Sequence, residues 1–147
     1  MITKAEHASN VLPWFELGNK IKYIELENNK VTLENVKKAI TDHTKVISIA
    51  HITNVLGDVR PIKEIIKYAH SKNIKVVIDG AQSVPHIKTD VKDLDMDFLA
   101  FSAHKMCGPT GVGVLYGKEE YLKEMKPLEF GGGMNASFAS DTTRVYD

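Results

Sequence analysis

Short apolar runs separated by polar turns predict a sheet of buried strands. Residues 46–50, 75–78 and 97–101 are rich in Val, Ile, Leu and Phe, and each run is too short for a typical helix. The run at residues 46–50 is typical of a strand that is covered on both faces, as in parallel sheets. Further strands are predicted at residues 2–3, 23–26 and 112–116.

Helices are predicted between these strands. Ile62, Ile65, Ile66 and Ala69 fall at i, i+3, i+4 and i+7, which places one apolar stripe on a helix that faces a sheet. Thr32 marks the start of a second helix, whose apolar positions continue to residue 40. Shorter helices are predicted at residues 14–17 and 119–125. Strands that alternate with helices in this way imply right-handed crossovers, so the predicted fold is α/β, with a mostly parallel sheet flanked by helices.

The end of the chain carries weaker patterns. The short loop before residues 112–116 allows that strand to run antiparallel. Gly131, Gly132 and Gly133 predict a flexible stretch, and the tail to Asp147 shows little periodicity. With 147 residues and no internal repeat or linker, we expect one domain with its own core.

Charge and cysteine content narrow the classes of function. The formal net charge is zero, which argues against electrostatic binding to nucleic acid or to anionic lipid. No apolar run has the length of a membrane span, and no signal peptide precedes the first charged residues. Cys107 is the only cysteine, so an internal disulfide is excluded, and we expect a cytoplasmic protein.

Two charged residues follow buried strands. Asp79 ends the run at 75–78, and Lys105 lies shortly after the run that ends at residue 101. In open parallel sheets the strand ends form the crevice where ligands bind. Pyridoxal phosphate (PLP) needs both a Schiff-base lysine and an acidic partner for its ring nitrogen, so it would use this pair. The alternatives are a surface lysine and an aspartate in an Asp-Gly turn.

Four segments in order carry a family resemblance: 5–7 (AEH), 51–57 (HITNVLG), 77–82 (VIDGAQ) and 102–105 (SAHK). Together they resemble the cysteine desulfurases of the class V aminotransferase group, especially the SufS-like branch and its selenocysteine lyase relatives. The resemblance runs from the start of the chain to about Gly133. It implies the large domain of PLP-dependent transferase fold type I, with residues 1–147 as a central part of that domain.

The resemblance also implies roles for single residues. Lys105 carries the cofactor and moves the substrate α-proton, and Asp79 faces the ring nitrogen. Other residues would contact the cofactor: Gln82 and Asn54 near the phenolic oxygen, Ser102 and His104 at the phosphate, and His7 stacked on the ring and assisting proton transfer. Each also has a plainer interpretation, such as a loop asparagine, a core histidine or an exposed histidine near a chain end. No metal site is expected.

The implied parent reaction converts L-cysteine to L-alanine and leaves a persulfide on the enzyme. That sulfur would pass to an acceptor protein for iron–sulfur cluster assembly, and the parent would be a homodimer. Two parts of the full enzymes are expected to lie outside residues 1–147. One is the N-terminal portion with a phosphate-binding loop, and the other is the C-terminal small domain with the nucleophilic cysteine and the arginine that binds the substrate carboxylate. We therefore expect no desulfurase turnover from this chain alone.

Other functions stay open at this point. One is a selenocysteine lyase or another class V aminotransferase, and another is a non-catalytic α/β domain that binds a nucleotide. Gly108, Gly111 and Gly113 give G-x-x-G-x-G, but they lead into a strand, whereas a dinucleotide fingerprint opens a helix. Cys107 lies two residues after Lys105, where the family has no reserved cysteine, so we expect a small semi-buried side chain there and not the nucleophile.

Overall fold

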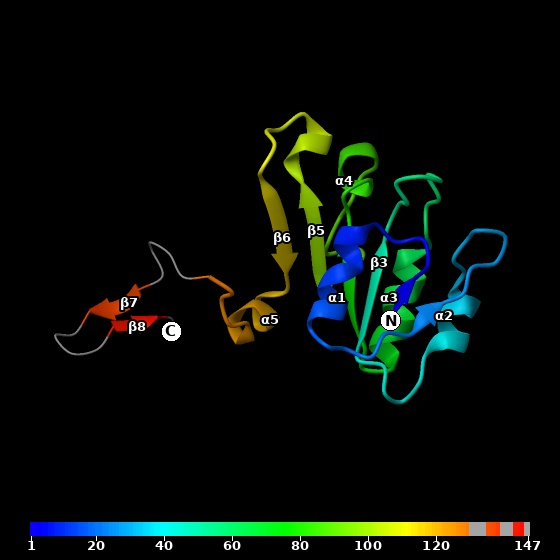
Figure 1. Ribbon diagram of the computed structural model, residues 1–147, viewed down its shortest axis with the longest axis horizontal. Helices are drawn as coiled ribbons and strands as arrows, with labels where there is room; N and C mark the ends of the chain where they lie inside the picture. Colours follow the sequence, from blue (N-terminus) through cyan, green and yellow to red (C-terminus); the bar gives the residue numbers. More distant parts are fainter. Residues whose placement is uncertain (130–134, 139–142, 146–147) are drawn as a thin grey trace.

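A four-stranded sheet forms the centre of the computed structural model, which describes residues 1–129, 135–138 and 143–145. Its strands lie in the order β3 (Val46–Ala50), β4 (Lys75–Asp79), β5 (Phe98–Ser102) and β6 (Gly113–Gly117) (Figure 1). The first three are parallel, and β6 runs antiparallel to β5. The predicted α/β class, the parallel strands and the antiparallel direction of β6 are confirmed.

A separate sheet of two short strands lies beside β3. β1 (Ile2–Thr3) pairs in parallel with β2 (Tyr23–Ile24), and the Ser48 N–H donates to the Met1 carbonyl at 2.8 Å. Only residues 23–24 of the predicted strand 23–26 are paired, because the chain then turns through an isolated bridge between Glu27 and Lys30.

The tail contains structure that its sequence pattern did not predict. β7 (Asn135–Phe138) and β8 (Thr143–Val145) form an antiparallel pair. Segments of three and four residues are too short for a period to stand out, so their pairing partner, and not their own pattern, defines them. The predicted flexible stretch at Gly131–133 lies outside the described residues.

Helices cover the sheet as the apolar stripes predict. α2 (Leu33–Ala39) begins at Thr32, whose hydroxyl accepts from the Asn35 N–H, and α3 (Ile62–Ser71) buries its whole apolar stripe. The other helical segments are α1 (Leu12–Glu16), α4 (Ser83–His86), α5 (Glu119–Glu124) and the 3₁₀ turns η1 (Ala8–Asn10) and η2 (Ala103–Met106). Sequence analysis missed α4, η1 and η2, because single turns carry too few residues to show a stripe. Within the described part of the chain, no helix is long and apolar enough to cross a membrane.

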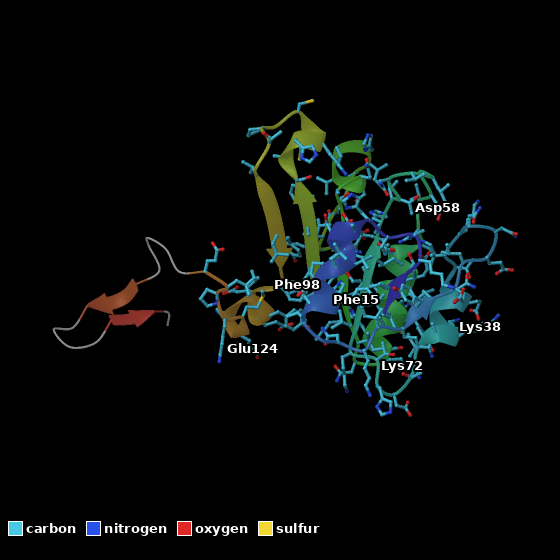
Figure 2. All side chains as sticks on the ribbon, in the orientation of Figure 1. Phe15, Lys38, Asp58, Lys72, Phe98 and Glu124 are labelled. Atoms are coloured by element: carbon cyan, nitrogen blue, oxygen red, sulfur yellow. The ribbon has the colours of Figure 1, made fainter. Side chains whose placement is uncertain are left out.

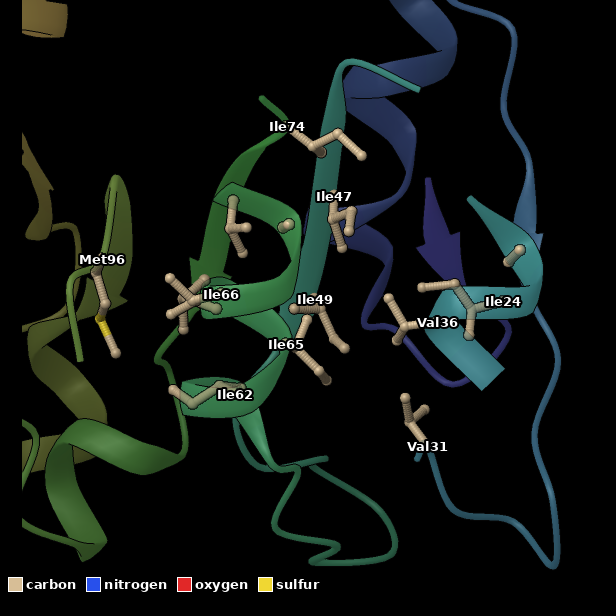
Figure 3. Packing of buried hydrophobic residues seen from close by; sticks show 14 of the residues in the cluster. Ile24, Val31, Val36, Ile47, Ile49, Ile62, Ile65, Ile66, Ile74 and Met96 are labelled. Carbon is tan, nitrogen blue, oxygen red and sulfur yellow. The ribbon is translucent and has the colours of Figure 1, made fainter. Parts of the chain in front are cut away.

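The core lies on one face of the sheet. Ile47 and Ile49 of β3 and Ile78 of β4 pack there against Ile65 and the rest of the α3 stripe (Figure 3). The opposite face is covered unevenly, since η1 contacts β3 but much of β5 is left open. The expectation that residues 46–50 form a fully buried strand is confirmed, since the last four residues of β3 are all buried. Residues of β4 and β5 on the partly open side of the sheet also line the cavity described next.

Candidate functional site

A cavity of about 430 Å³ lies where β3, β4 and β5 end. The loops that follow these parallel strands gather at the upper end of the sheet in Figure 1. Figure 2 labels Asp58 at that end, while Phe98 at the start of β5 lies lower. All of the residues predicted for the site line this one cavity: His7, Asn54, Asp79, Gln82, Ser102, His104 and Lys105. Asp79 and Lys105 thus line the same cavity.

Asp79 is the last residue of β4 and is half-buried. Its Oδ1 accepts from the Ala81 N–H at 2.9 Å, which holds the carboxylate in place through the turn. Gly80 allows close packing beside this turn, because a Cβ there would lie 2.5 Å from Leu99 Cδ1 and would force that side chain to shift. Within the described residues Oδ2 has no hydrogen-bond partner, so one oxygen is free to face a ligand.

Lys105 lies on η2, the tight turn that follows β5. The turn is closed by two backbone bonds, from the Ala103 N–H to the Val112 carbonyl at 3.0 Å and from the Gly108 N–H to the Ala103 carbonyl at 2.9 Å. It ends at Cys107, which is exposed and adopts a left-handed conformation with φ of 62°. The expectation that Cys107 is semi-buried is wrong. Lys105 is half-buried, and no described residue forms an ion pair or hydrogen bond with its amine, which leaves the amine available to a ligand.

Two further loops contribute His7 and Asn54 to the cavity lining. This exposed histidine begins η1, and its Nδ1 accepts from the Ser9 N–H at 3.2 Å. The accepting role leaves Nδ1 without a proton, so the neutral ring carries its proton on Nε2. Asn54 lies in a loop closed by mutual hydrogen bonds between Thr53 and Asp58. Both residues therefore come from loops with defined backbone geometry.

The remaining predicted residues supply donors. Ser102 ends β5 and His104 follows it on η2, while Gln82 lies just before α4. In the described part of the chain, the Ser102 hydroxyl, the His104 imidazole and the Gln82 amide have no side-chain hydrogen bond. Unused donors that converge on one cavity suit a phosphate or a phenolic oxygen.

Sequence analysis missed some residues of the wall. Ser9 and Asn10 line the cavity together with apolar residues from the three strands. Asn10 is buried and accepts from the Ser48 hydroxyl, a contact that joins η1 to β3. A single 3₁₀ turn after His7 has no sequence pattern that marks these side chains as inward-facing.

The lining fits a flat ligand that carries both charges. Asp79 can face a cationic ring nitrogen, Lys105 can react with a carbonyl group, and the hydroxyl and imidazole can hold an anion. Ala50, Val77 and Phe101 add apolar surface for a ring. The volume lies within the range of small-molecule sites. No cluster of three or more potential metal ligands occurs among residues 1–129, 135–138 and 143–145.

Fold and cavity together define an α/β domain with a cavity at the ends of its parallel strands. The family model of the class-V aminotransferases matches residues 1–147. The chain therefore belongs to the class-V aminotransferase family.

Individual relatives carry more specific names. A probable cysteine desulfurase of Halalkalibacterium halodurans is 48% identical over 139 residues, which are 91% of this chain and 34% of that protein. The cysteine desulfurase of Haloferax volcanii is 42% identical over 139 residues, 91% of this chain and 33% of that protein. This chain thus spans about a third of the length of the curated relatives it matches.

Solved structures agree with the fold. The cysteine desulfurase CsdA of Escherichia coli superposes with a TM-score of 0.91 at 36% identity, covering 98% of this chain and 37% of that chain. The apo cysteine desulfurase of Thermococcus onnurineus NA1 gives 0.89 at 36% identity, covering 99% of this chain and 38% of that chain. The likeness includes nearly all of this chain and somewhat more than a third of each of those chains.

Proposed function

We propose that this chain forms the cofactor-binding part of a PLP-dependent cysteine desulfurase. One observation carries the proposal: the half-buried carboxylate of Asp79 and the half-buried amine of Lys105 line the same cavity. Unpaired charges near a core are unfavourable unless a ligand or another group compensates them. The family and the names of its relatives point to the same chemistry.

Each site residue has a defined task in this proposal. The Asp79 carboxylate pairs with the ring nitrogen of PLP, and Lys105 faces the aldehyde. Gln82 and Asn54 donate to the phenolic oxygen. Ser102 and His104 hold the phosphate, for which a hydroxyl and an imidazole are suitable donors. His7 would contact the ring with its Nε2–H available, because its Nδ1 is engaged by the Ser9 N–H.

Proton movement is assigned to two residues. When bound, PLP withdraws electrons from the substrate and makes its α-proton more acidic. The Lys105 amine, once neutral, accepts that proton, and the His7 imidazole assists. The substrate of the parent enzyme is L-cysteine and its product L-alanine, with the sulfur retained as an enzyme persulfide for an acceptor protein in iron–sulfur cluster assembly. The parent acts as a cytoplasmic homodimer.

Covalent labelling of Lys105 tests this function. The chain is incubated with PLP, reduced with borohydride, digested, and analysed by mass spectrometry. We expect a pyridoxyl group on the peptide that bears Lys105, and its loss in Lys105→Ala. Lys88→Ala is the matched control, because Lys88 is exposed and does not line the cavity. Asp79→Asn should weaken PLP binding while leaving the fold intact. Labelling spread over surface lysines, without preference for Lys105, would contradict the proposal.

A further inference from the structure

A buried ion pair lies directly behind one wall of the cavity. The side chains of Glu6 and Arg60 are 0% and 1% exposed, and Arg60 Nη1 contacts Glu6 Oε1. Glu6 itself does not line the cavity, although its neighbours Ala5 and His7 do. Its side chain therefore points away from the ligand space and into the protein.

Both oxygens of the Glu6 carboxylate are fully engaged. Oε1 accepts from Arg60 and from the Thr3 hydroxyl. Oε2 accepts from Asn10 Nδ2 at 2.8 Å and from the Ala50 N–H at 2.8 Å. Since Ala50 is the end of β3, the carboxylate joins the loop of residues 3–10 to the sheet.

Arg60 connects the same segments from the other side. Its Nη1 also donates to the Ala50 carbonyl at 3.2 Å, and Nη2 donates to the Thr3 hydroxyl at 3.1 Å and the Ala5 carbonyl at 3.2 Å. Arg60 belongs to the loop between β3 and α3, so three separate segments meet at this guanidinium. They meet behind the wall that His7 helps to form.

We propose that Glu6 and Arg60 are positioning residues that fix His7 against the cavity. The turn that carries His7 is anchored at both ends by Glu6: through the chain itself, and through Asn10, whose N–H donates to the His7 carbonyl at 2.8 Å. A single 3₁₀ turn has too few internal hydrogen bonds to hold its own orientation. The inference rests on the proposed function only in that His7 contacts the cofactor.

The Glu6–Arg60 pair acts mainly on the position of the turn that carries His7, and less on the stability of the fold. A buried ion pair often contributes little net stability compared with a pair of well-packed neutral side chains, because removing both charges from water is unfavourable. The contacts of Glu6 and Arg60 are nearly all to loop backbone and small polar groups around His7. Loss of the pair should therefore change the geometry of the turn even where the fold is kept.

Glu6→Gln in the whole chain tests this role. The variant keeps the shape but places an amide donor where four donors converge, which leaves buried groups unpaired. We expect amide exchange of Ser9 and Asn10 to quicken by about tenfold or more, because their bonds to His7 open locally. The NMR signals of the His7 ring should shift. PLP affinity should fall by roughly three- to tenfold, the range expected for a lost ring contact.

Asp97→Asn is the matched control. Asp97 is also a fully buried carboxylate, but it precedes β5 and so lies at the other end of the sheet. It should destabilise the chain without a selective change at Ser9, Asn10 or His7.

The double variant Glu6→Gln/Arg60→Met separates position from stability. We expect the unfolding midpoint to recover towards that of the native chain, because no buried charge remains unpaired. Exchange at Ser9 and Asn10 should stay fast. The inference is overturned if Glu6→Gln leaves these amides and the His7 signals unchanged, or if the double variant restores them together with the midpoint. Exchange is measured without PLP, so a native chain that binds no PLP would refute the proposed function while this measurement still decides the inference.

Discussion

Gly108→Ala tests whether the turn that carries Lys105 is set by close packing. Gly108 closes η2 through its N–H, which donates to the Ala103 carbonyl at 2.9 Å. A Cβ at residue 108 would lie 2.8 Å from Ala103 Cβ and 2.9 Å from the Ala103 oxygen. Neither atom belongs to a flexible side chain, so the backbone beside His104 must move.

The expected loss of stability follows from these contacts. Overpacking of this kind typically destabilises a protein by about 1–3 kcal/mol. Opening the turn would also lose one hydrogen bond, worth about 1 kcal/mol. Together they give a decrease of about 2–4 kcal/mol in the free energy of unfolding, a sizeable part of the roughly 5–15 kcal/mol of an ordinary domain. Because Lys105 moves with the turn, its labelling by PLP should fall as well.

Urea unfolding followed by circular dichroism measures the first effect, and labelling of Lys105 measures the second. Gly113→Ala is the matched control, since it makes the same chemical change five residues on. A Cβ there would meet only the Phe101 oxygen, at 3.7 Å, which is an ordinary contact. We expect this control to unfold within about 0.5 kcal/mol of the native chain and to keep its labelling. Equal unfolding and labelling of the two variants would refute the reasoning.

Three further predictions concern the rest of the fold. Ile65→Ala removes a fully buried side chain of α3 and should lower the free energy of unfolding by about 2–5 kcal/mol. Urea titrations measure this loss, and a loss below about 1 kcal/mol would contradict the assigned core. Asp97→Asn should lower the free energy of unfolding by about 2–4 kcal/mol, because Asp97 Oδ2 accepts from the Val76 N–H and Asp97 Oδ1 lies 3.1 Å from Lys118 Nζ. That distance suits an ion pair, although the two groups are not aligned as a hydrogen bond. Unchanged stability would contradict this prediction. Burial lowers the pKa of His51 from 6.5, so the unfolded chain binds a proton more readily than the folded chain does. The free energy of unfolding should therefore decrease as the pH falls through 6.5. An NMR titration that places the His51 pKa at or above 6.5 would refute this prediction.

The sequence alone determined the main elements and singled out two charged residues that line the cavity. The apolar runs identified β3, β4 and β5 within a residue or two, and the stripe of α3 identified its buried face. Asp79 and Lys105 could be singled out because charged residues follow apolar runs there. These patterns are local, because a few neighbouring residues are enough to show which side of a helix or strand is buried.

Only the tertiary structure brought the site together. His7, Asn54 and Lys105 come from three separate loops, and it is the parallel arrangement of the strands that gathers those loops at one end of the sheet. The Glu6–Arg60 pair was beyond reach of the sequence pattern, since 54 positions separate its partners and a charged loop residue is ordinarily expected at the surface. A period in the sequence reports burial, whereas a contact between distant segments depends on how the whole chain packs.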